Sequence, residues 1–466
     1  MKKFAVLIAG GSGTRLWPLS SSIKPKFFLP YSKKESIIQR HVANISKCGF
    51  ERLIIVTSLA FEEDLKLSLK DIRIPIDYLC EPIPRNTGPS IFFAIDYIKR
   101  FGNDSMFMVF PADHIISDYS EIKNLIGLYE KKHSKFPLIS LVKSTKKLSN
   151  KFGYLLGVKK ENGIFASTKF IEKPSLEKLS SLKKISRLYI NTGIFISSVS
   201  FFMKELSAID PNFVKSLKKS INKGGKTLSF ESFSEVKSIS IDKMLMERTK
   251  SHSFKIFKSN WKDIGSFESY VDFVDQELSD SEGNYLISSN SVIKDSSDNF
   301  FWSKDKFVSI LGLSNIMCIE NEGNILLANK NLLGNNNDFF EEVKKRFHKS
   351  TLKDNFNLRP WGWFLTLKEE PGYKVKQIMI FKGQSISLQS HKKRQETWTL
   401  VEGRGEVQVG KEIFKVSKGK TIQIPMNSKH RIKNVGKNNL VFIEVQLGSY
   451  LGEDDIIRYE DVYNRN

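Results

Sequence analysis

A glycine-rich loop near the start of the chain has the composition of a phosphate-binding site. It follows the apolar run Phe4 to Ile8 and contains Gly10, Gly11 and Gly13. Glycine lets the backbone turn tightly and approach a ligand, and the N–H groups of such a loop form a cradle for phosphate oxygens. We therefore expect the loop to bind a nucleotide. Its predicted nucleotide-binding residues are Gly10, Gly11, Ser12, Gly13, Thr14 and Arg15.

The loop matches neither of two common nucleotide-binding patterns. No Gly-Lys-Ser/Thr follows, so it is not a Walker A motif, and it lacks the third glycine of the dinucleotide fingerprint. It carries Arg15 instead, and arginine is always charged and can bind phosphate through two parallel hydrogen bonds. Arg15 is thus the expected catalytic contact to a polyphosphate. The alternative is that the segment is a simple strand-to-helix turn.

Further polar groups follow later apolar runs and could complete the same site. Lys26 supplies a mobile cation soon after the loop, and the polar loop Cys80 to Gly88 is suited to holding a base edge. Asp113 follows the apolar run Ser105 to Phe110, a usual place for a metal ligand, and Asp263 offers a second carboxylate. An aspartate at such a position is also common as a turn residue or helix cap. It is the joint appearance of these segments that indicates a site.

A second set of candidate residues lies toward the carboxyl end of the chain. Alternation along a strand puts Gln389 and His391 on the same face, and Glu396 and His430 could join them. Two nitrogen and two oxygen ligands would leave open positions on Zn²⁺ or a similar divalent ion. A single histidine on a strand is more often structural, but the paired spacing favours a metal site.

The elements that must position these residues divide the chain into three parts. Residues 1–280 alternate short apolar strands with helical stretches, which predicts an α/β fold of the Rossmann-like kind, with a mixed, mostly parallel sheet. Residues 281–350 are rich in Ser, Asn, Asp and Gly and predict a small β-rich connector and a bridging helix. Residues 351–466 are nearly all strands and turns, which is typical of a small β-barrel or jelly roll.

The composition narrows the class of protein. The net charge is +22 over 466 residues, but the lysines are scattered and no nucleic-acid-binding motif is recognisable, so we expect a surface that steers anionic small substrates and not a nucleic-acid binder. The sequence contains no apolar run of about 18 residues, so we expect no membrane span. The three cysteines are widely spaced and form no CxxC pair, which fits a reducing compartment. We therefore expect a cytoplasmic protein.

The first part of the chain resembles the sugar-1-phosphate nucleotidyltransferases, and among them the mannose-1-phosphate guanylyltransferases. The motifs that carry the resemblance are Gly10-Gly-Ser-Gly-Thr-Arg-Leu-Trp-Pro18, Pro25-Lys26, Glu81-Pro82, Arg85-Asn-Thr87, Pro111-Ala-Asp-His114, Glu172-Lys-Pro174, Asn191-Thr-Gly193, and Trp261 with Asp263. The resemblance implies that Arg15 and Lys26 contact the triphosphate of GTP, and that Asp113 and Asp263 hold Mg²⁺. The residues that it places at the sugar phosphate are Glu172, Lys173, Asn191 and Gly193, and those at the nucleotide, besides the loop, are Arg85, Asn86 and Thr87.

The reaction that this resemblance implies needs little proton transfer. An oxygen of the sugar 1-phosphate attacks the α-phosphorus of the triphosphate, and pyrophosphate leaves. The nucleophile is already anionic, so catalysis is positioning plus neutralisation of charge. Two positions depart from the family pattern: Phe27 stands where Gln is usual, and Gly88 where Ala is usual.

The last part of the chain resembles the cupins, and among them the type II phosphomannose isomerases. The carrying segments are Arg359-Pro-Trp-Gly362, Ser387-Leu-Gln-Ser-His391, Arg394-Gln-Glu-Thr-Trp398, Ile424-Pro425, His430-Arg431 with Asn434, Ile443-Glu-Val-Gln446, and Tyr450-Leu-Gly-Glu-Asp-Asp455. The resemblance implies a catalytic contact from Arg394 and a substrate phosphate bound by groups near Lys392 and Arg431. Thr397 stands where the family has His. The implied reaction is aldose–ketose isomerisation through an enediol.

The two resemblances together cover nearly the whole chain and predict a bifunctional enzyme. We expect it to have no nucleic-acid or membrane partners, and a homo-oligomer is possible. Its predicted substrates are GTP, mannose 1-phosphate, and mannose 6-phosphate or fructose 6-phosphate, and its predicted cofactors are Mg²⁺ and a divalent metal such as Zn²⁺ in the cupin. One alternative is a guanylyltransferase whose cupin only binds sugar or regulates. Another is a basic, nucleic-acid-associated protein with vestigial sites. The sequence pattern leaves open the base identity, the isomerase metal, the oligomeric state and the glycan served.

Overall fold

The computed structural model describes most of the chain in two compact units, Met1–Asn336 and Asn337–Asn466. The described residues are 1–11, 16–20, 25–32, 34–145, 149–185, 187–265, 267–271, 279–287, 291–303, 306–321, 324–332, 338–339, 342–343, 346, 356–359 and 361–460. The bridging helix expected within residues 281–350 falls largely outside the described residues.

The first unit is built on a nine-stranded sheet of order β3-β2-β1-β4-β9-β6-β10-β8-β7. Strand β1 runs parallel to β2 and to β4, and β6 runs parallel to β10, whereas β9 is antiparallel to both β4 and β6. The sheet is therefore mixed, and the α/β class expected from the sequence is confirmed. The strands are β1 Lys3–Ala9, β2 Arg52–Ser58, β3 Ile76–Glu81, β4 Met106–Pro111, β6 Leu138–Ser144, β7 Tyr154–Lys159, β8 Ile164–Ile171, β9 Tyr189–Ser198 and β10 His252–Ile256.

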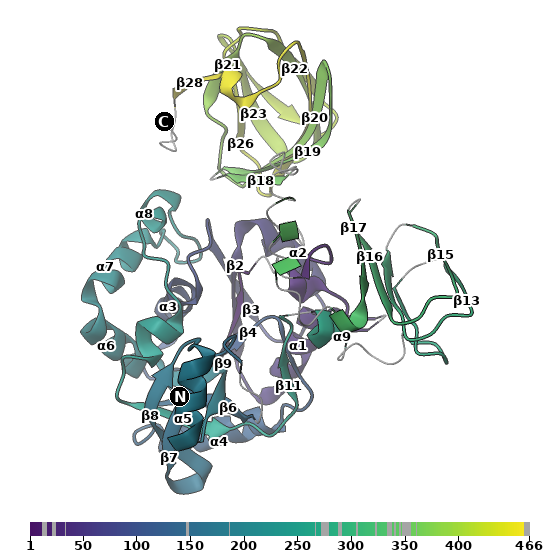
Figure 1. The fold of residues 1–466 in the computed structure, drawn as a ribbon. Helices are drawn as coiled ribbons and strands as arrows, with labels where there is room; N and C mark the ends of the chain where they lie inside the picture. The colour runs from purple at the N-terminus through teal and green to yellow at the C-terminus, as the bar shows by residue number, and fades with distance from the viewer. Residues whose placement is uncertain are drawn as a thin grey trace. The chain divides into compact units, whose positions relative to one another are not determined.

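Helices cover both faces of this sheet, which explains why strands β1 and β4 are apolar at nearly every position. In β1, Phe4 and Val6 face a core that includes residues of α3, α6 and α7, whereas Ala5 and Leu7 face a core that includes residues of α1, α2 and α4. Figure 1 shows α3, α6 and α7 on one side of the sheet and α1 and α2 on the other. The helices are α1 Ile37–Ile45, α2 Glu62–Ser68, α3 Thr87–Ile98, α4 Ser120–Lys132, α5 Leu176–Ile185, α6 Val199–Ile209, α7 Pro211–Ser220, α8 Phe230–Ser234 and α9 Phe267–Val271, with a π-helix at Asp242–Met246.

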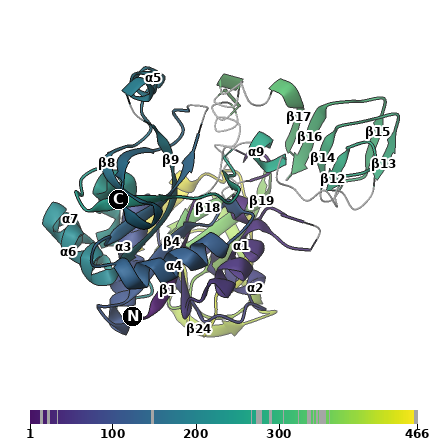
Figure 2. The ribbon, with the colours of Figure 1, turned by 90° about the horizontal axis from the view of Figure 1, so that it is seen from below.

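A small β region follows the sheet within the first unit. It consists of a four-stranded sheet, β12-β14-β16-β17, and a two-stranded sheet, β13-β15. Figure 2 shows these short strands running side by side. Their bounds are β12 Tyr285–Ile287, β13 Ser291–Lys294, β14 Phe300–Ser303, β15 Val308–Leu311, β16 Ile316–Asn321 and β17 Asn324–Asn329.

The second unit packs two antiparallel sheets around one apolar core. The six-stranded sheet has the order β18-β19-β20-β27-β22-β25, and the five-stranded sheet has the order β24-β23-β26-β21-β28. Trp398, Ile432 and Phe442 lie in the core between them. The strands are β18 Phe356–Arg359, β19 Gly362–Glu370, β20 Tyr373–Ile380, β21 Leu388–His391, β22 Arg394–Glu402, β23 Arg404–Val409, β24 Glu412–Ser417, β25 Thr421–Ile424, β26 His430–Asn434, β27 Leu440–Gly448 and β28 Ile456–Glu460.

Within the described part of the chain, no helix has the length and apolar character needed to cross a bilayer.

Candidate active sites

Strand pairing brings two predicted metal ligands of the first unit together. Asp113 lies just beyond the end of β4, immediately before the short strand β5 (His114–Ile116). Strand β11 (Trp261–Asp263) pairs antiparallel with β5 and sets Asp263 opposite His114. Ligand atoms of Asp113, His114 and Asp263 lie within 4.8 Å of one another. Two carboxylates this close are suited to a divalent cation with oxygen ligands.

The ammonium group of Lys26 lies against both carboxylates. Its Nζ forms an ion pair with Asp113, lies 3.6 Å from Asp263 Oδ1, and donates a hydrogen bond of 3.1 Å to the Ile264 carbonyl. Lys26 begins a short 3-10 helix, Lys26–Phe28, and is buried. Burial raises the pKa of Asp113, but the charge of Lys26 outweighs it and holds that pKa at about 2. The carboxylate is therefore ionised at neutral pH.

A cavity of about 310 Å³ joins these groups to the expected sugar-phosphate residues. Asn191 and Gly193 reach it from β9, and the Gly193 N–H donates to Asn191 Oδ1 at 3.2 Å. Lys173 has a positive φ of 44°, an uncommon conformation for a residue with a side chain, and such strain often accompanies a functional site. The predicted residues that line this cavity are Gly11, Lys26, Thr87, Asp113, Glu172, Lys173, Asn191, Gly193 and Asp263.

Asp242 and Gly153 also line the cavity, and neither was predicted from the sequence. Asp242, at the start of the π-helix, accepts a hydrogen bond from Asn191 Nδ2 at 2.9 Å. Its burial, with a smaller effect from nearby Glu172, raises its pKa to about 7. Gly153 lines the wall, and a Cβ there would lie 2.6 Å from Glu172 Oε2. A π-helix often marks a functional site, but nothing in the local sequence of Asp242 signals one.

The expected base-binding loop is only partly turned toward the cavity. Thr87 lines it, and Asn86 caps α3 from a backbone with a positive φ of 70°. Arg85 instead donates to the backbone carbonyl of Ser234, so its guanidinium is engaged within the protein. Gly10 follows β1 near the buried carboxylate of Glu81. Ser12, Gly13, Thr14 and Arg15 lie outside the described residues, and their roles stay predictions from the sequence.

The two departures from the family pattern have local explanations. Phe27 is buried in an apolar core, with its ring 4.8 Å from that of Phe28 and 6.3 Å from that of Phe61. Gly88 donates its N–H to the Ile239 carbonyl at 2.9 Å, and a Cβ at this position would lie 2.6 Å from that oxygen. Alanine would therefore clash with this backbone, and glycine fits it.

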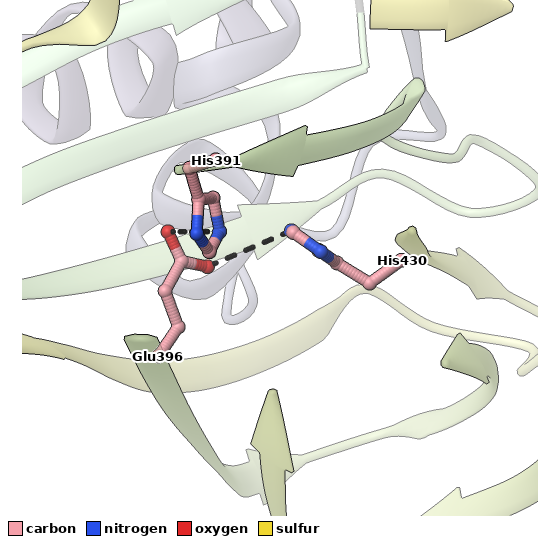
Figure 3. A group of neighbouring side chains, drawn as sticks. All are labelled: His391, Glu396 and His430. Atoms are coloured by element: carbon pink, nitrogen blue, oxygen red, sulfur yellow. Dashed lines mark ion pairs between the residues drawn. The ribbon is translucent and has the colours of Figure 1, made fainter. Parts of the chain in front are cut away.

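Three predicted metal ligands of the second unit converge in the interior of the barrel. His391 ends β21, Glu396 lies in β22 and His430 begins β26. Their ligand atoms lie within 4.8 Å of one another, and all three side chains are buried. Figure 3 shows the two imidazoles directed at the carboxylate, with Nε2 of His391 at 3.1 Å from Oε1 and Nε2 of His430 at 3.8 Å from Oε2.

Backbone carbonyls fix the tautomers of both histidines. Nδ1 of His391 lies 2.8 Å from the Arg394 carbonyl, and Nδ1 of His430 lies 2.8 Å from the Ser428 carbonyl. Each Nδ1 therefore donates its proton to a carbonyl, and each Nε2 faces the carboxylate of Glu396. A cluster of electron-pair donors directed at one point suits a divalent cation, and carbonyl partners of this kind orient metal-binding histidines.

Arg394 and Gln389 also lie in the surroundings of Glu396. Arg394 is 1% exposed, and its Nε donates to Glu396 Oε1 at 3.0 Å. Burial raises the pKa of Glu396, but the hydrogen bond and charge of His391, with His430 and Arg394, lower it well below the usual value. Gln389 pairs with His430 across β21 and β26 and lines a pocket that also includes Arg394 and Glu396.

The structure places the other expected residues of this domain outside that pocket. The backbone N–H of Lys392 donates to Asp455 at 3.2 Å, and neither Lys392 nor Arg431 lines the pocket. Thr397 alternates with the buried residues Glu396 and Trp398, so it faces the other side of β22. The substitution of the family's histidine at 397 therefore leaves the ligand cluster intact.

Comparisons with known proteins match both units. Residues 4–280 match the family model described as nucleotidyl transferase, and residues 346–461 match the model described as mannose-6-phosphate isomerase C-terminal. The xanthan biosynthesis protein XanB of Xanthomonas campestris is 30% identical, covering 99% of this chain and 98% of that protein. The mannose-1-phosphate guanylyltransferase RfbM of Salmonella typhimurium is 28% identical, covering 99% and 97%.

A solved structure supports the fold. The crystal structure of a mannose-1-phosphate geranyltransferase from Thermus thermophilus superposes with a TM-score of 0.62 at 22% identity, covering 75% of this chain and all of that one. At this identity the likeness concerns the architecture alone.

Proposed function

The chain belongs to the nucleotidyl transferase family, and on that premise we propose that its first unit transfers GMP from GTP to mannose 1-phosphate and releases pyrophosphate. The observation that carries the proposal is the single cavity that holds Lys26, Asp113 and Asp263 together with Glu172, Lys173 and Asn191. A cation suited to phosphates and carboxylates suited to a divalent metal ion thus line the same cavity as polar groups suited to sugar hydroxyls.

We propose that the expected site residues divide the work of the reaction. Lys26 neutralises phosphate charge, and Arg15 does so from the loop that also includes Gly10 to Thr14. Asp113 and Asp263 would hold a divalent cation, for which we propose Mg²⁺, and this ion neutralises charge on the phosphates when it is bound. The proposed sugar-phosphate contacts are Glu172, Lys173, Asn191 and Gly193, and the proposed further nucleotide contacts are Arg85, Asn86 and Thr87.

Pyrophosphate release tests this assignment. The full chain is assayed with GTP, ATP, UTP and dTTP against mannose 1-phosphate and glucose 1-phosphate. We expect release to be fastest with GTP and mannose 1-phosphate. A clear preference for another nucleotide or sugar would show that the proposed substrates are wrong and the reaction type is right. No pyrophosphate release with any pair would contradict the proposal.

We propose that the second unit interconverts mannose 6-phosphate and fructose 6-phosphate. Two imidazole nitrogens and a carboxylate directed at one point, next to a buried arginine, support this proposal. His391, Glu396 and His430, with Gln389, would hold Zn²⁺ or a similar ion, which polarises the substrate oxygens when it is bound. Arg394 orients the Glu396 carboxylate and lines the pocket into which the sugar enters.

Conversion of fructose 6-phosphate to mannose 6-phosphate by the metal-loaded full chain tests the second activity. We expect turnover that His391→Ala abolishes. A well-folded, metal-loaded protein without turnover would favour a cupin that only binds sugar or regulates.

We also propose that the enzyme works in the cytoplasm. GTP is a substrate of that compartment, and Cys48, Cys80 and Cys318 are free thiols. Burial raises the pKa of the Cys48 thiol to about 11, which keeps it unreactive. Cell fractionation tests the location, and recovery of the enzyme outside the cytoplasm would contradict it.

A further inference from the structure

Two buried lysines on one strand of the barrel call for an explanation, because a buried ammonium group is costly without partners. Alternate residues of β20 face inward, among them Lys374 and Lys376. Lys376 is 4% exposed and lines the pocket that contains Arg394 and Glu396. Lys374 is 8% exposed but lies outside that pocket, where its Nζ donates to the Leu451 carbonyl at 2.9 Å.

A continuous row of polar groups connects Lys376 to the metal-ligand cluster. The register sets Lys376 opposite Glu444 of β27 and sets Gln446, two residues on, opposite Glu396. Gln446 Nε2 donates to Glu396 Oε1 at 3.2 Å and to Glu444 Oε2 at 2.9 Å, and Lys376 Nζ lies 4.0 Å from that same Glu444 oxygen. The ammonium group is thus a few hydrogen-bond lengths from the ligands, a separation suited to opposite ends of one hexose phosphate.

The ion-pair partner of Lys376 is the carboxylate of Glu453, and another anion could take its place. Nζ of Lys376 lies 2.5 Å from Glu453 Oε1, in the loop before β28. The Glu453 side chain is 45% exposed, whereas that of Lys376 is 5% exposed. The carboxylate can therefore rotate into solvent while the ammonium group stays in the pocket.

The backbone of this loop is anchored independently of Glu453. Arg394 Nη1 donates to the Gly452 carbonyl at 2.9 Å, and the N–H groups of Lys392 and Lys393 donate to Asp455 at 3.2 and 3.0 Å. Release of Lys376 thus requires rotation of one side chain and no movement of the loop.

Two further cations line the same pocket. Arg359 reaches it from β18 and Arg458 from β28. The Nε atom of Arg458 is buried without a hydrogen-bond partner among the described residues. Guanidinium and ammonium groups around one pocket are the usual recognition elements for a phosphate dianion.

We propose that Lys376, with Arg359 and Arg458, binds the phosphate of the sugar phosphate in the second unit, and that this phosphate replaces the carboxylate of Glu453. The proposal rests on the isomerase function proposed above and names its phosphate subsite. It replaces the expectation that groups near Lys392 and Arg431 bind the phosphate.

The matched pair Lys376→Met and Lys374→Met tests the proposal, because both changes remove a buried inward-facing ammonium group from the same strand. For the metal-loaded full chain, we expect Lys376→Met to raise the KM for fructose 6-phosphate roughly 10- to 100-fold, the effect of losing one charge-assisted contact. Lys374→Met is expected to change it less than about threefold. Equal effects of the two changes on KM would overturn the proposal.

Two other variants keep the test decisive if Lys376→Met does not fold. Arg458→Gln should raise the same KM, and Glu453→Gln should lower it because the competing charge is removed. An unchanged KM in both variants would contradict the proposal.

Calorimetric titration with fructose 6-phosphate and with fructose tests the phosphate subsite independently of the proposed isomerase reaction. Lys376→Met should weaken binding of the phosphorylated sugar and leave that of fructose unchanged. If the wild-type chain binds fructose 6-phosphate through Lys376 but does not isomerise it, the proposed function fails and the subsite stands. If it isomerises the sugar and Lys376→Met binds it normally, the subsite fails alone.

Discussion

The half-buried Asp113 and the buried Glu396 both stay ionised beside a cation. Lys26 plays this part for Asp113, and Arg394 does so for Glu396. A buried charge without such partners would instead take up a proton. Both sites therefore offer an ionised carboxylate that can bind a metal ion. The neighbouring cation can bind phosphate, as proposed for Lys26, or orient the carboxylate, as Arg394 does for Glu396.

Removal of the Lys26 charge should disable nucleotidyl transfer. Lys26→Met keeps the apolar stem but leaves the phosphates without one cation, so we expect kcat/KM to fall by about 100-fold or more. Pyrophosphate release measures it. Lys34→Met, on an exposed lysine of the following turn, is the control and should leave the rate unchanged. A loss of less than about threefold in Lys26→Met would exclude Lys26 from the chemistry.

Glu81 should make the stability of the first unit fall as the pH rises. It is 4% exposed at the end of β3, and burial raises its pKa from 4.5 to about 8, although Ser90 donates to it at 2.7 Å. Between these pH values the folded chain holds a proton that the unfolded chain has released, so stability is full below about 4.5 and is lost as the pH rises toward about 8.

Glu81→Gln removes this titration while keeping the shape of the side chain. We expect its melting temperature to exceed that of the wild type at pH 8.5 and the difference to shrink toward pH 5, with a free-energy difference of a few kcal/mol at most. The measurement is thermal unfolding at both pH values. Parallel pH profiles for the two proteins would show that Glu81 is not the responsible group.

At the scale of elements, two glycines in helices should respond oppositely to alanine. Gly88, in the first turn of α3, lies against the Ile239 backbone, so Gly88→Ala should destabilise the protein by about 1–3 kcal/mol. Gly127, in the middle of α4, has open space where a Cβ would be added, with no neighbour within 4 Å, so Gly127→Ala should stabilise it by up to about 1 kcal/mol. Thermal unfolding measures both. A Gly88→Ala protein as stable as the wild type would show that α3 can shift away from Ile239.

Local patterns predicted the elements that carry the sites better than they predicted the sites' surroundings. A strand buried on both faces of a sheet is a continuous apolar run, so β1 and the end of β4 could be located in the sequence. Asp113 was predicted because it follows the second of these runs. Asp242 and Lys376 were missed because only tertiary contacts give them a role. Asp242 lies on a short helix far along the chain from its partner Asn191. In the sequence Lys376 is one of many scattered lysines, and only strand pairing shows that it lies opposite Glu444.

At the scale of the whole molecule, each unit has its own apolar core and its own candidate site. The cores of the first unit lie on the two faces of its sheet, and the core of the second lies inside its barrel. Each unit therefore has the means to fold around its site without residues of the other. The two proposed reactions should accordingly be separable by single substitutions.

The most direct test of a chain with two independent active sites is to measure both reactions in the same preparations of Asp113→Asn and His391→Ala. We predict that Asp113→Asn loses at least about 100-fold of GTP-dependent pyrophosphate release and keeps fructose 6-phosphate isomerisation within about twofold. His391→Ala should show the reverse. Loss of both reactions in either folded variant, or absence of one of them from the wild-type chain, would contradict the account.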